Sequence, residues 1–320
     1  MNPRMRKALD WRTGLALAGD VKWRLAGPCP QPMDDTLAAV RVAWPKRYQH
    51  PNARAFVQTV HDAFALRSRL TYANIEQPYE GVVVMRIDAG GGWSDVALDY
   101  FDLTHVNERC AGDVDHYFKM QYLREGYAPL KNVYPGGYVT SSTWLYRNSC
   151  RLRRLHLLSQ PSRSVFGRFG LRFSADIRRR ALEILTHDQR FDFKGSTKQT
   201  KLSWYLREMA GAAVCIDLPG NGPFCYRLVE SMAMGCCVLG PPHVTRLPVE
   251  LRTGIEIVNC REDLSDLGDL CAFYASNPVA AAQVGEASAR YFDRYLHPVR
   301  LVSHYVDAIR NPPEQDSVPA

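Results

Sequence analysis

One stretch of the sequence decides the fold: Asp217-Leu-Pro-Gly-Asn-Gly-Pro-Phe-Cys-Tyr-Arg-Leu-Val-Glu-Ser-Met-Ala-Met-Gly-Cys-Cys-Val-Leu-Gly-Pro-Pro242. It begins at the end of an apolar run, Ala212 to Leu218, that is typical of a buried strand. A Pro-Gly-Asn-Gly turn, a helical pattern over Pro223 to Met234 and an apolar strand over Cys236 to Leu239 follow. This order predicts a parallel β-α-β unit, which binds ligands at the carboxyl ends of its strands.

The turn before this helix is suited to hold an anion. Gly220 and Gly222 let backbone amides approach a ligand, and the helix presents its positive end there, with Tyr226 in the first turn. Arg227 and Glu230 are three residues apart, so they share a helix face and place a guanidinium for phosphate beside a carboxylate for paired hydroxyls. A plain surface acid at 230, or a simple ion pair with Arg227, would give the same pattern.

The same alternation extends over the C-terminal half. Strands are expected at Ser164 to Phe169, Phe191 to Phe193 and Gly254 to Val258, and helices from Ser174 as N-cap to Thr186, over Lys201 to Ala210 and over Leu264 to Ala275. The last helical stretch, Val279 to Ile309, is broken near His297-Pro298, because proline cannot continue a helix. The tail from Asn311 is expected to be loose.

The N-terminal half is predicted to be mixed α/β. It has strand-like runs at Leu37 to Trp44 and Gly81 to Ile87 and a helical pattern over Arg54 to Arg69. The Gly90-Gly-Gly92 turn follows the second strand, with Asp88 and Asp95 on either side. With 320 residues, two domains are expected. We assign 1–155 to an N-terminal Rossmann-like domain, 156–295 to a C-terminal one and 296–320 to a helix packing back towards the first, with a loose tail.

Composition narrows the class of protein. Hydrophobic residues make up 46% and charged residues 23%, as in ordinary folded proteins. The apolar stretch Thr13 to Gly19 is too short for a signal peptide or a spanning helix, which favours the cytoplasm. The nine cysteines form no Cys-x-x-Cys pair and are expected to be reduced core residues. Neither cysteine nor histidine spacing predicts a bound metal.

Arginines are concentrated in the middle of the chain, which carries a net charge of +7. They are Arg147, Arg151, Arg153, Arg154, Arg163, Arg168, Arg172, Arg178, Arg179 and Arg180. Such a tract can bind a phosphate-bearing donor, an anionic membrane or nucleic acid. Arginines on a solvated helix face would give the same count without a partner.

The segment Glu230-Ser-Met-Ala-Met-Gly-Cys-Cys-Val238 resembles the donor-binding segment of GT-B glycosyltransferases of group 1, in which an acidic residue precedes Ala-x-Gly-x-x-Val. Upstream, Phe166-Gly-Arg-Phe-Gly-Leu-Arg172 is similar to the family's Gly-Arg-x-x-x-Lys pattern. The resemblance implies two Rossmann-like domains facing a cleft. It also implies that Glu230 binds the donor ribose, while Arg168, Arg172 and Arg227 bind the diphosphate.

The sequence departs from the family at one position. Many retaining members carry a second glutamate, and Gly222 stands where it is expected. An inverting enzyme needs a base on the acceptor side, for which Asp88 and Asp95 are the candidates. Asp113-Val-Asp115 also matches the Asp-x-Asp metal motif of the other large glycosyltransferase fold, a pair that is common by chance.

The expected function is transfer of a hexose or pentose from a nucleotide diphosphate sugar, with a UDP-sugar as co-substrate and no tightly bound cofactor. A glycan or lipid-linked glycan is the expected acceptor, with peripheral contact to an anionic membrane. DNA with hydroxymethylated pyrimidines is an alternative acceptor. A nucleotide-sugar epimerase and a non-catalytic nucleic-acid-binding protein are further alternatives.

Overall fold

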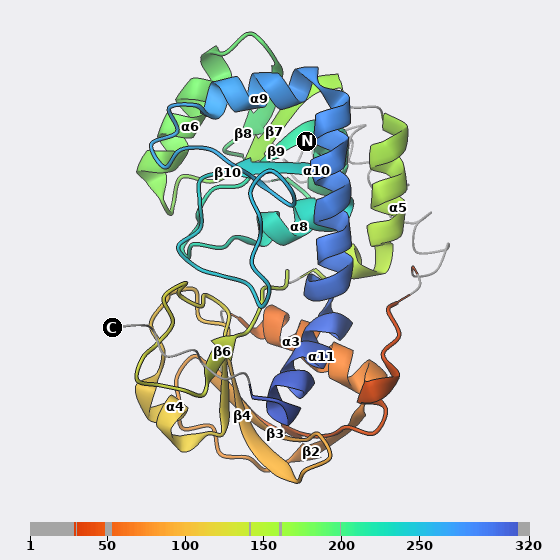
Figure 1. Cartoon of the computed structure of the whole chain (residues 1–320), viewed down its shortest axis with the longest axis vertical. Coiled ribbons are helices and arrows are strands. Elements are labelled where there is room, and N and C mark those ends of the chain that lie inside the picture. The colour runs from red at the N-terminus through yellow and green to blue at the C-terminus, as the bar shows by residue number, and fades with distance from the viewer. Residues whose placement is uncertain are drawn as a thin grey trace, which may run out of the picture.

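The computed structural model describes residues 29, 31–48, 53–140, 142–159, 162–198 and 200–312. Expectations for the first 27 residues and for the tail beyond residue 312 lie outside these ranges. The described chain forms two α/β halves stacked along the long axis of the molecule (Figure 1). Each half is built on one sheet, with six strands in the N-terminal half and five in the C-terminal half.

The N-terminal sheet has the strand order β2-β1-β3-β4-β5-β6. Its strands are β1 (Arg41–Pro45), β2 (Arg69–Ala73), β3 (Val82–Asp88), β4 (Trp93–Asp99), β5 (His116–Lys119) and β6 (Val133–Pro135). Strand β3 is antiparallel to both of its neighbours, whereas the other pairings are parallel. The carboxyl ends of β1, β2, β4, β5 and β6 therefore meet at one edge of the sheet, and the end of β3 lies at the opposite edge.

Helices cover both faces of this sheet. Helices α3 (Arg54–Arg67) and α11 (Pro298–Arg310) pack against each other on one face, and α4 (Glu108–Asp113) lies on the other. The side chains of β3 pack into the cores on both faces of the sheet, because successive side chains point to opposite faces of a strand. Val83, Met85 and Ile87 belong to the core with α3 and α11, and Val82 and Val84 to the core with α4. A 3-10 turn, η1 (Asp35–Leu37), precedes β1.

The C-terminal sheet is parallel throughout, with the order β11-β10-β9-β7-β8. Its strands are β7 (Ser162–Arg168), β8 (Asp192–Ser196), β9 (Ala212–Ile216), β10 (Cys237–Gly240) and β11 (Val258–Asn259). The chain runs from β7 to β8 on one side and then to β9 on the other. The crevice at this reversal is where doubly wound sheets bind ligands.

The helices of the C-terminal half are α5 (Thr143–Ser159), α6 (Ala175–His187), α7 (Leu202–Ala210), α8 (Tyr226–Met234), α9 (Leu267–Ser276) and α10 (Pro278–Tyr291). Helices α5, α7 and α8 contact one another, and α6 and α10 contact α9. The two-domain α/β prediction of fold class is thus confirmed, with β3 as an antiparallel exception in the N-terminal sheet.

Three local predictions need correction. The strand expected over Gly254 to Val258 is only β11, because the preceding residues form a turn. The helix expected from Pro223 begins at Tyr226. Ser174 precedes α6 as expected but does not cap it, because its hydroxyl donates to the Gly220 carbonyl at 2.7 Å.

From β1 onwards, the described chain crosses between the halves at two places. The first crossing ends where α5 begins, and α5 packs on α7 and α8. We therefore infer a domain boundary near residue 142 rather than 155. The second crossing follows a π-helical turn, η2 (Phe292–Leu296), and His297 N-caps α11, so the break expected at His297-Pro298 is present.

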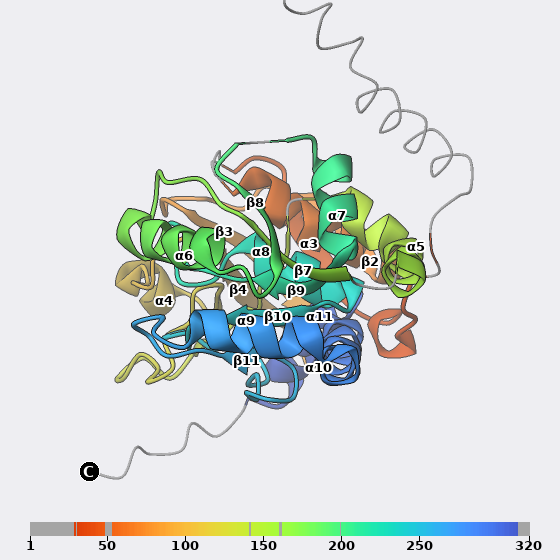
Figure 2. The same cartoon turned by 90° about the horizontal axis from the view of Figure 1, so that it is seen from above.

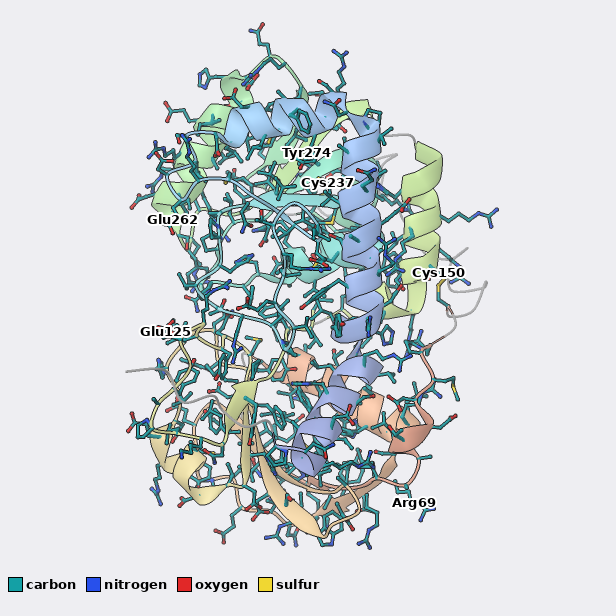
Figure 3. The ribbon with its side chains drawn as sticks, viewed as in Figure 1. Arg69, Glu125, Cys150, Cys237, Glu262 and Tyr274 are labelled. Carbon is teal, nitrogen blue, oxygen red and sulfur yellow. A yellow bond between two sulfur atoms is a disulfide. The ribbon has the colours of Figure 1, made fainter. Side chains whose placement is uncertain are left out.

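Loops of the two halves also join directly, in a contact that we call the seam. Leu123 forms a β-bridge with Thr245, the Arg124 amide donates to the Val244 carbonyl at 3.0 Å, and the Arg246 amide donates to the Tyr122 carbonyl at 2.9 Å. Arg124 also pairs with Glu250 at 2.9 Å. Figure 3 places Glu125, next to the seam, on the opposite flank from Cys150 on α5.

The prediction that all cysteines are reduced is wrong for one pair. Cys29 and Cys150 form a disulfide, which ties the first described residue to α5. The other seven cysteines are free and buried, as expected. This removes the cysteine argument for a cytoplasmic location. Within the described ranges, no helix is long and apolar enough to cross a membrane.

Candidate active site in the interdomain cavity

A cavity of about 580 Å³ lies between the halves, at the carboxyl edge of the C-terminal sheet. The loops after β7, β8 and β9 and the first turn of α8 supply most of its wall. The N-terminal half contributes Phe56, Asp102 and Tyr138. The cavity thus coincides with the crevice predicted from the strand order.

Two buried guanidiniums form the inner wall of the cavity. Arg227 donates to the carbonyls of Arg168 and Leu218 at 3.2 Å each, and its guanidinium lies over the Phe169 ring. Arg178 donates to the carbonyls of Pro219 and Gly170 at 2.9 and 2.6 Å. Both arginines therefore brace the loops after β7 and β9 while they keep positive charge at the cavity.

The outer wall carries three further cations. Arg168 forms a bidentate pair with Glu208, at 2.5 and 2.9 Å, so its charge is largely neutralised. Arg172 is exposed and stacks on Phe173, and Lys198 is exposed as well. Among the described residues, no carboxylate lies within ion-pair distance of Arg172 or Lys198. These two cations are available to a bound anion.

Glu230 lies behind this wall rather than in it. Its carboxylate is buried, and Oε1 accepts a hydrogen bond from the Thr140 hydroxyl at 3.1 Å. Oε2 and the Tyr205 hydroxyl are both buried and lie close enough for Tyr205 to stabilise the ionised carboxylate, and Tyr205 lines the cavity. Burial raises the pKa of Glu230 to about 7, although hydrogen bonds from Thr140 and Tyr205 and the charge of Arg227 oppose the shift.

Asp217, at the end of β9, is a second buried acid. Its oxygens accept no hydrogen bond from the described residues, and the nearest basic side chains are Arg227, with Nε at 3.8 Å, and the imidazole of His243, with Nε2 at 3.5 Å. Burial raises the pKa of Asp217 to about 7 against the charges of Arg227 and Arg178, and burial lowers that of His243 to about 4. Unpartnered buried groups beside a cavity are typical of a ligand site.

The two glycines of the turn have different roles. Gly220 lines the cavity, and a Cβ there would lie 2.5 Å from Cys225 Sγ. Gly222 instead contacts the N-terminal half, where a Cβ would lie 2.1 Å from the Asp102 carbonyl oxygen. The expectation that Gly222 lines the donor site is therefore corrected. The glutamate that the family often carries here has no room.

Asp102 is the only carboxylate among the described residues that line the cavity. It follows β4 on the N-terminal side, and its Oδ2 accepts from the Asn221 amide at 3.4 Å. A buried pair holds the loop, because Lys119 Nζ donates to Asp99 Oδ2 at 3.0 Å and to the Phe101 carbonyl at 3.2 Å. Asp102 thus lines the same cavity as the arginines.

The structure does not bring Asp88 and Asp95 to the cavity. Asp88 lies at the end of the antiparallel strand β3 and pairs with Trp93 at the start of β4, at the sheet edge away from the cleft. Its carboxylate binds Arg41 and accepts from the Gly90 amide at 2.8 Å, which holds the glycine turn in place. Asp95 pairs with Arg86 at 2.7 Å. This geometry corrects the expectation that either acid faces the acceptor.

No cluster of histidine, cysteine and acidic side chains suited to a metal is present in the described residues. The two acids of the Asp-x-Asp pair, Asp113 and Asp115, bind different partners. Asp113 accepts from the Tyr79 hydroxyl at 2.6 Å, and Asp115 accepts from the Asp95 amide at 2.8 Å. Both acids therefore stabilise the N-terminal domain.

The donor residues expected from sequence converge in part. Arg168, Arg172, Gly220, Tyr226 and Arg227 line the cavity, whereas Glu230 lies behind it and Gly222 lies at the domain contact. Sequence reasoning did not single out Arg178, Tyr205 or Asp102 as site residues. Their position in the sequence could have identified them, since each lies in or next to a segment that adjoins the carboxyl end of a strand.

Comparison with known proteins gives little further information. No family model matches the sequence, and no curated protein matches it. Among solved structures, the chain is similar to Anabaena HepE, which was crystallised in complex with UDP. The TM-score is 0.36 and the identity 14%, over 58% of this chain and 59% of that one. The chain thus spans less than two thirds of HepE.

Proposed function

We propose that this chain is a glycosyltransferase that uses a nucleotide diphosphate sugar, with a UDP-sugar as co-substrate. The observation that carries the proposal is the cavity itself, which collects guanidiniums at the carboxyl edge of a doubly wound sheet and has Asp102 as the one carboxylate in its described lining. Guanidiniums bind phosphate oxygens in charge-assisted pairs and stabilise a departing diphosphate.

The donor would bind with its diphosphate against Arg172, Arg178 and Arg227. Its ribose hydroxyls would meet the Tyr205 hydroxyl and Glu230 Oε2, two neighbouring buried groups of which Tyr205 lines the cavity. Burial, and next the charge of Glu230, raise the pKa of Tyr205 well above its usual value, so this hydroxyl stays protonated and can donate. Arg168, which is neutralised by Glu208, would position its loop.

Asp102 is our candidate for the acceptor base, in place of Asp88 and Asp95. In this step the acceptor hydroxyl attacks the anomeric carbon, its proton passes to Asp102, and the bond to the diphosphate breaks with its electron pair on the leaving group. A base on the face opposite the leaving group implies inversion at the anomeric carbon. Gly222 stands where many retaining enzymes carry a second glutamate, and the lack of that acid agrees with inversion.

Ligand binding tests the donor site without knowledge of the acceptor. UDP at one hundred times its Kd should stabilise the fold by about 2.7 kcal/mol, seen as a higher melting temperature. In calorimetry, Arg172→Ala should weaken UDP several-fold more than it weakens uridine, which has no phosphate. Arg69→Ala, at the far end of the N-terminal half (Figure 3), is the matched control and should leave both affinities unchanged.

Turnover distinguishes the alternative functions. A mass-spectrometric screen would offer UDP-sugars with glycans, lipid-linked glycans or DNA carrying hydroxymethylated bases. Donor turnover without any acceptor would indicate an epimerase. Salt-dependent DNA binding that ignores nucleotide sugars and Glu230→Ala would indicate a non-catalytic protein. If no nucleotide or nucleotide sugar raises the melting temperature, the glycosyltransferase proposal is wrong.

A further inference from the structure

Two loops beside the cavity form an amphipathic surface, which we call the mouth surface. One loop joins β7 to α6 and carries Arg172 and Phe173, and the other joins β8 to α7 and carries Lys198 and Lys201, with Leu202 as the first residue of α7. Because β7 and β8 are parallel neighbours, both loops leave the sheet at the same edge. Strand β8 and α7 lie on the side of the molecule opposite α10 and α11 (Figure 2).

The apolar side chains of the mouth surface are exposed although they border a cavity. Phe173 and Leu202 are each 39% exposed, and both line the cavity rim. Transfer of a phenyl ring or a leucine side chain from water into an apolar medium is favourable in free energy. Their position therefore favours a partner that offers hydrocarbon as well as charge.

The charged side chains of the mouth surface are all cations without an acidic partner. Arg172, Lys198 and Lys201 are exposed, and no ion pair within the described chain involves them. Two acids of the neighbouring helices already pair with other arginines: Asp176 pairs with Arg179, and Glu208 pairs with Arg168. The surface thus carries uncompensated positive charge around two apolar side chains.

We infer that the mouth surface docks on an anionic lipid bilayer. Basic side chains are attracted to anionic headgroups, and apolar side chains between them enter the acyl boundary. A nucleic acid backbone would use the cations but would leave Phe173 and Leu202 in water. Under the proposed function, on which only this last step rests, the dock would present the cavity to an acceptor carried in the membrane.

Vesicle co-sedimentation of the whole protein tests the dock. We expect binding to phosphatidylcholine vesicles that contain about one-third phosphatidylglycerol, no binding to pure phosphatidylcholine, and release by salt. Phe173→Ser with Leu202→Ser should lower the affinity about tenfold or more. Lys198→Glu with Lys201→Glu should do the same, and neither lysine is among the residues proposed to bind the donor.

Matched controls lie away from the mouth surface. Phe273 on α9 is 52% exposed, and Arg69 is an exposed cation at the far end of the N-terminal half, so Phe273→Ser and Arg69→Glu should bind vesicles like the wild type. All four variants change exposed side chains, and thermal melting checks that they are folded. Equal vesicle binding by all variants overturns the dock, as does failure to bind anionic vesicles or binding of duplex DNA alone. UDP binding is measured separately, so failure of the donor site is seen independently.

Discussion

Gln121 and Phe224 exchange two hydrogen bonds across the domain boundary. The Gln121 side-chain amide donates to the Phe224 carbonyl at 3.0 Å, and the Phe224 amide donates back to Gln121 Oε1 at 2.9 Å. Both residues are buried, so neither backbone group of Phe224 has water as a substitute. One side chain of the N-terminal half therefore fixes the loop that leads into α8.

Gln121→Ala should destabilise the protein by about 2–4 kcal/mol, because it leaves two buried backbone groups unpaired. Urea unfolding measures the change. Gln121→Met keeps most of the side-chain volume but loses both hydrogen bonds, so it should be destabilised as well and separates the loss of the hydrogen bonds from the cavity left by alanine. Equal stability of all three proteins would show that the exchange contributes nothing.

Gly222→Ala should weaken the domain contact, because the new Cβ would lie 2.1 Å from the Asp102 carbonyl oxygen. We expect a loss of about 1–3 kcal/mol, as for other overpacked sites, together with faster proteolysis at the boundary. Gly112→Ala is the matched control, since a Cβ there meets nothing within 4 Å and the residue lies in α4. If both variants melt together, the close contact at Gly222 is not a constraint.

Glu230 should make stability fall with rising pH. Burial raises its pKa in the folded protein from 4.5 to about 7, so the folded state holds the proton more tightly than the unfolded state. This contribution is complete below the unfolded pKa and is lost as the pH rises through the folded one. Glu230→Gln keeps a neutral isostere at every pH.

Unfolding at about pH 5 and at about pH 8 checks this dependence. Relative to the wild type, Glu230→Gln should be more stable at the higher pH and similar at the lower one. Glu262→Gln changes an exposed glutamate (Figure 3) and should show no such pH-dependent gain. A gain for Glu230→Gln that is the same at both pH values would contradict the expected shift.

The Cys29–Cys150 disulfide closes a loop with a sequence separation of 121 residues. By the chain-entropy model, the double variant Cys29→Ser, Cys150→Ser should lose up to about 5 kcal/mol of stability. A reductant should lower the melting temperature of the wild type towards that of the variant and leave the variant unchanged. A reductant effect of equal size on both proteins would place its origin elsewhere.

Much of the C-terminal fold could be predicted from sequence because its strands are short apolar runs and its helices have clear periods. Helix α5 was not predicted, since its arginines obscured the helical pattern between Thr143 and Ser159. Helix α5 packs on α7 and α8, and this tertiary contact is not evident from the sequence of α5 itself. The disulfide was missed for a similar reason, because pairing depends on a contact between Cys29 and Cys150 that spacing does not encode.

The candidate site was less predictable than the fold. Local sequence singled out Arg168, Arg172 and Arg227, and the structure places all three at the border of the cavity, within a few residues of the strand ends. Asp88 was chosen because it flanks the triple-glycine turn, but β3 is antiparallel to β1 and β4, so its end lies at the edge away from the cavity, and strand direction depends on pairing. Asp102 could not be predicted, because it reaches the cavity only through the packing of the two halves, which no single segment specifies.

The seam has a mechanical consequence for the two halves. Backbone crossings join them on one flank, and the seam fastens them on the other, near Glu125 (Figure 3). The Gln121–Phe224 hydrogen bonds and the close approach of Gly222 to Asp102 hold the halves together beside the cavity as well. The halves should therefore resist sliding and twisting, and opening at the cavity would first have to break these contacts.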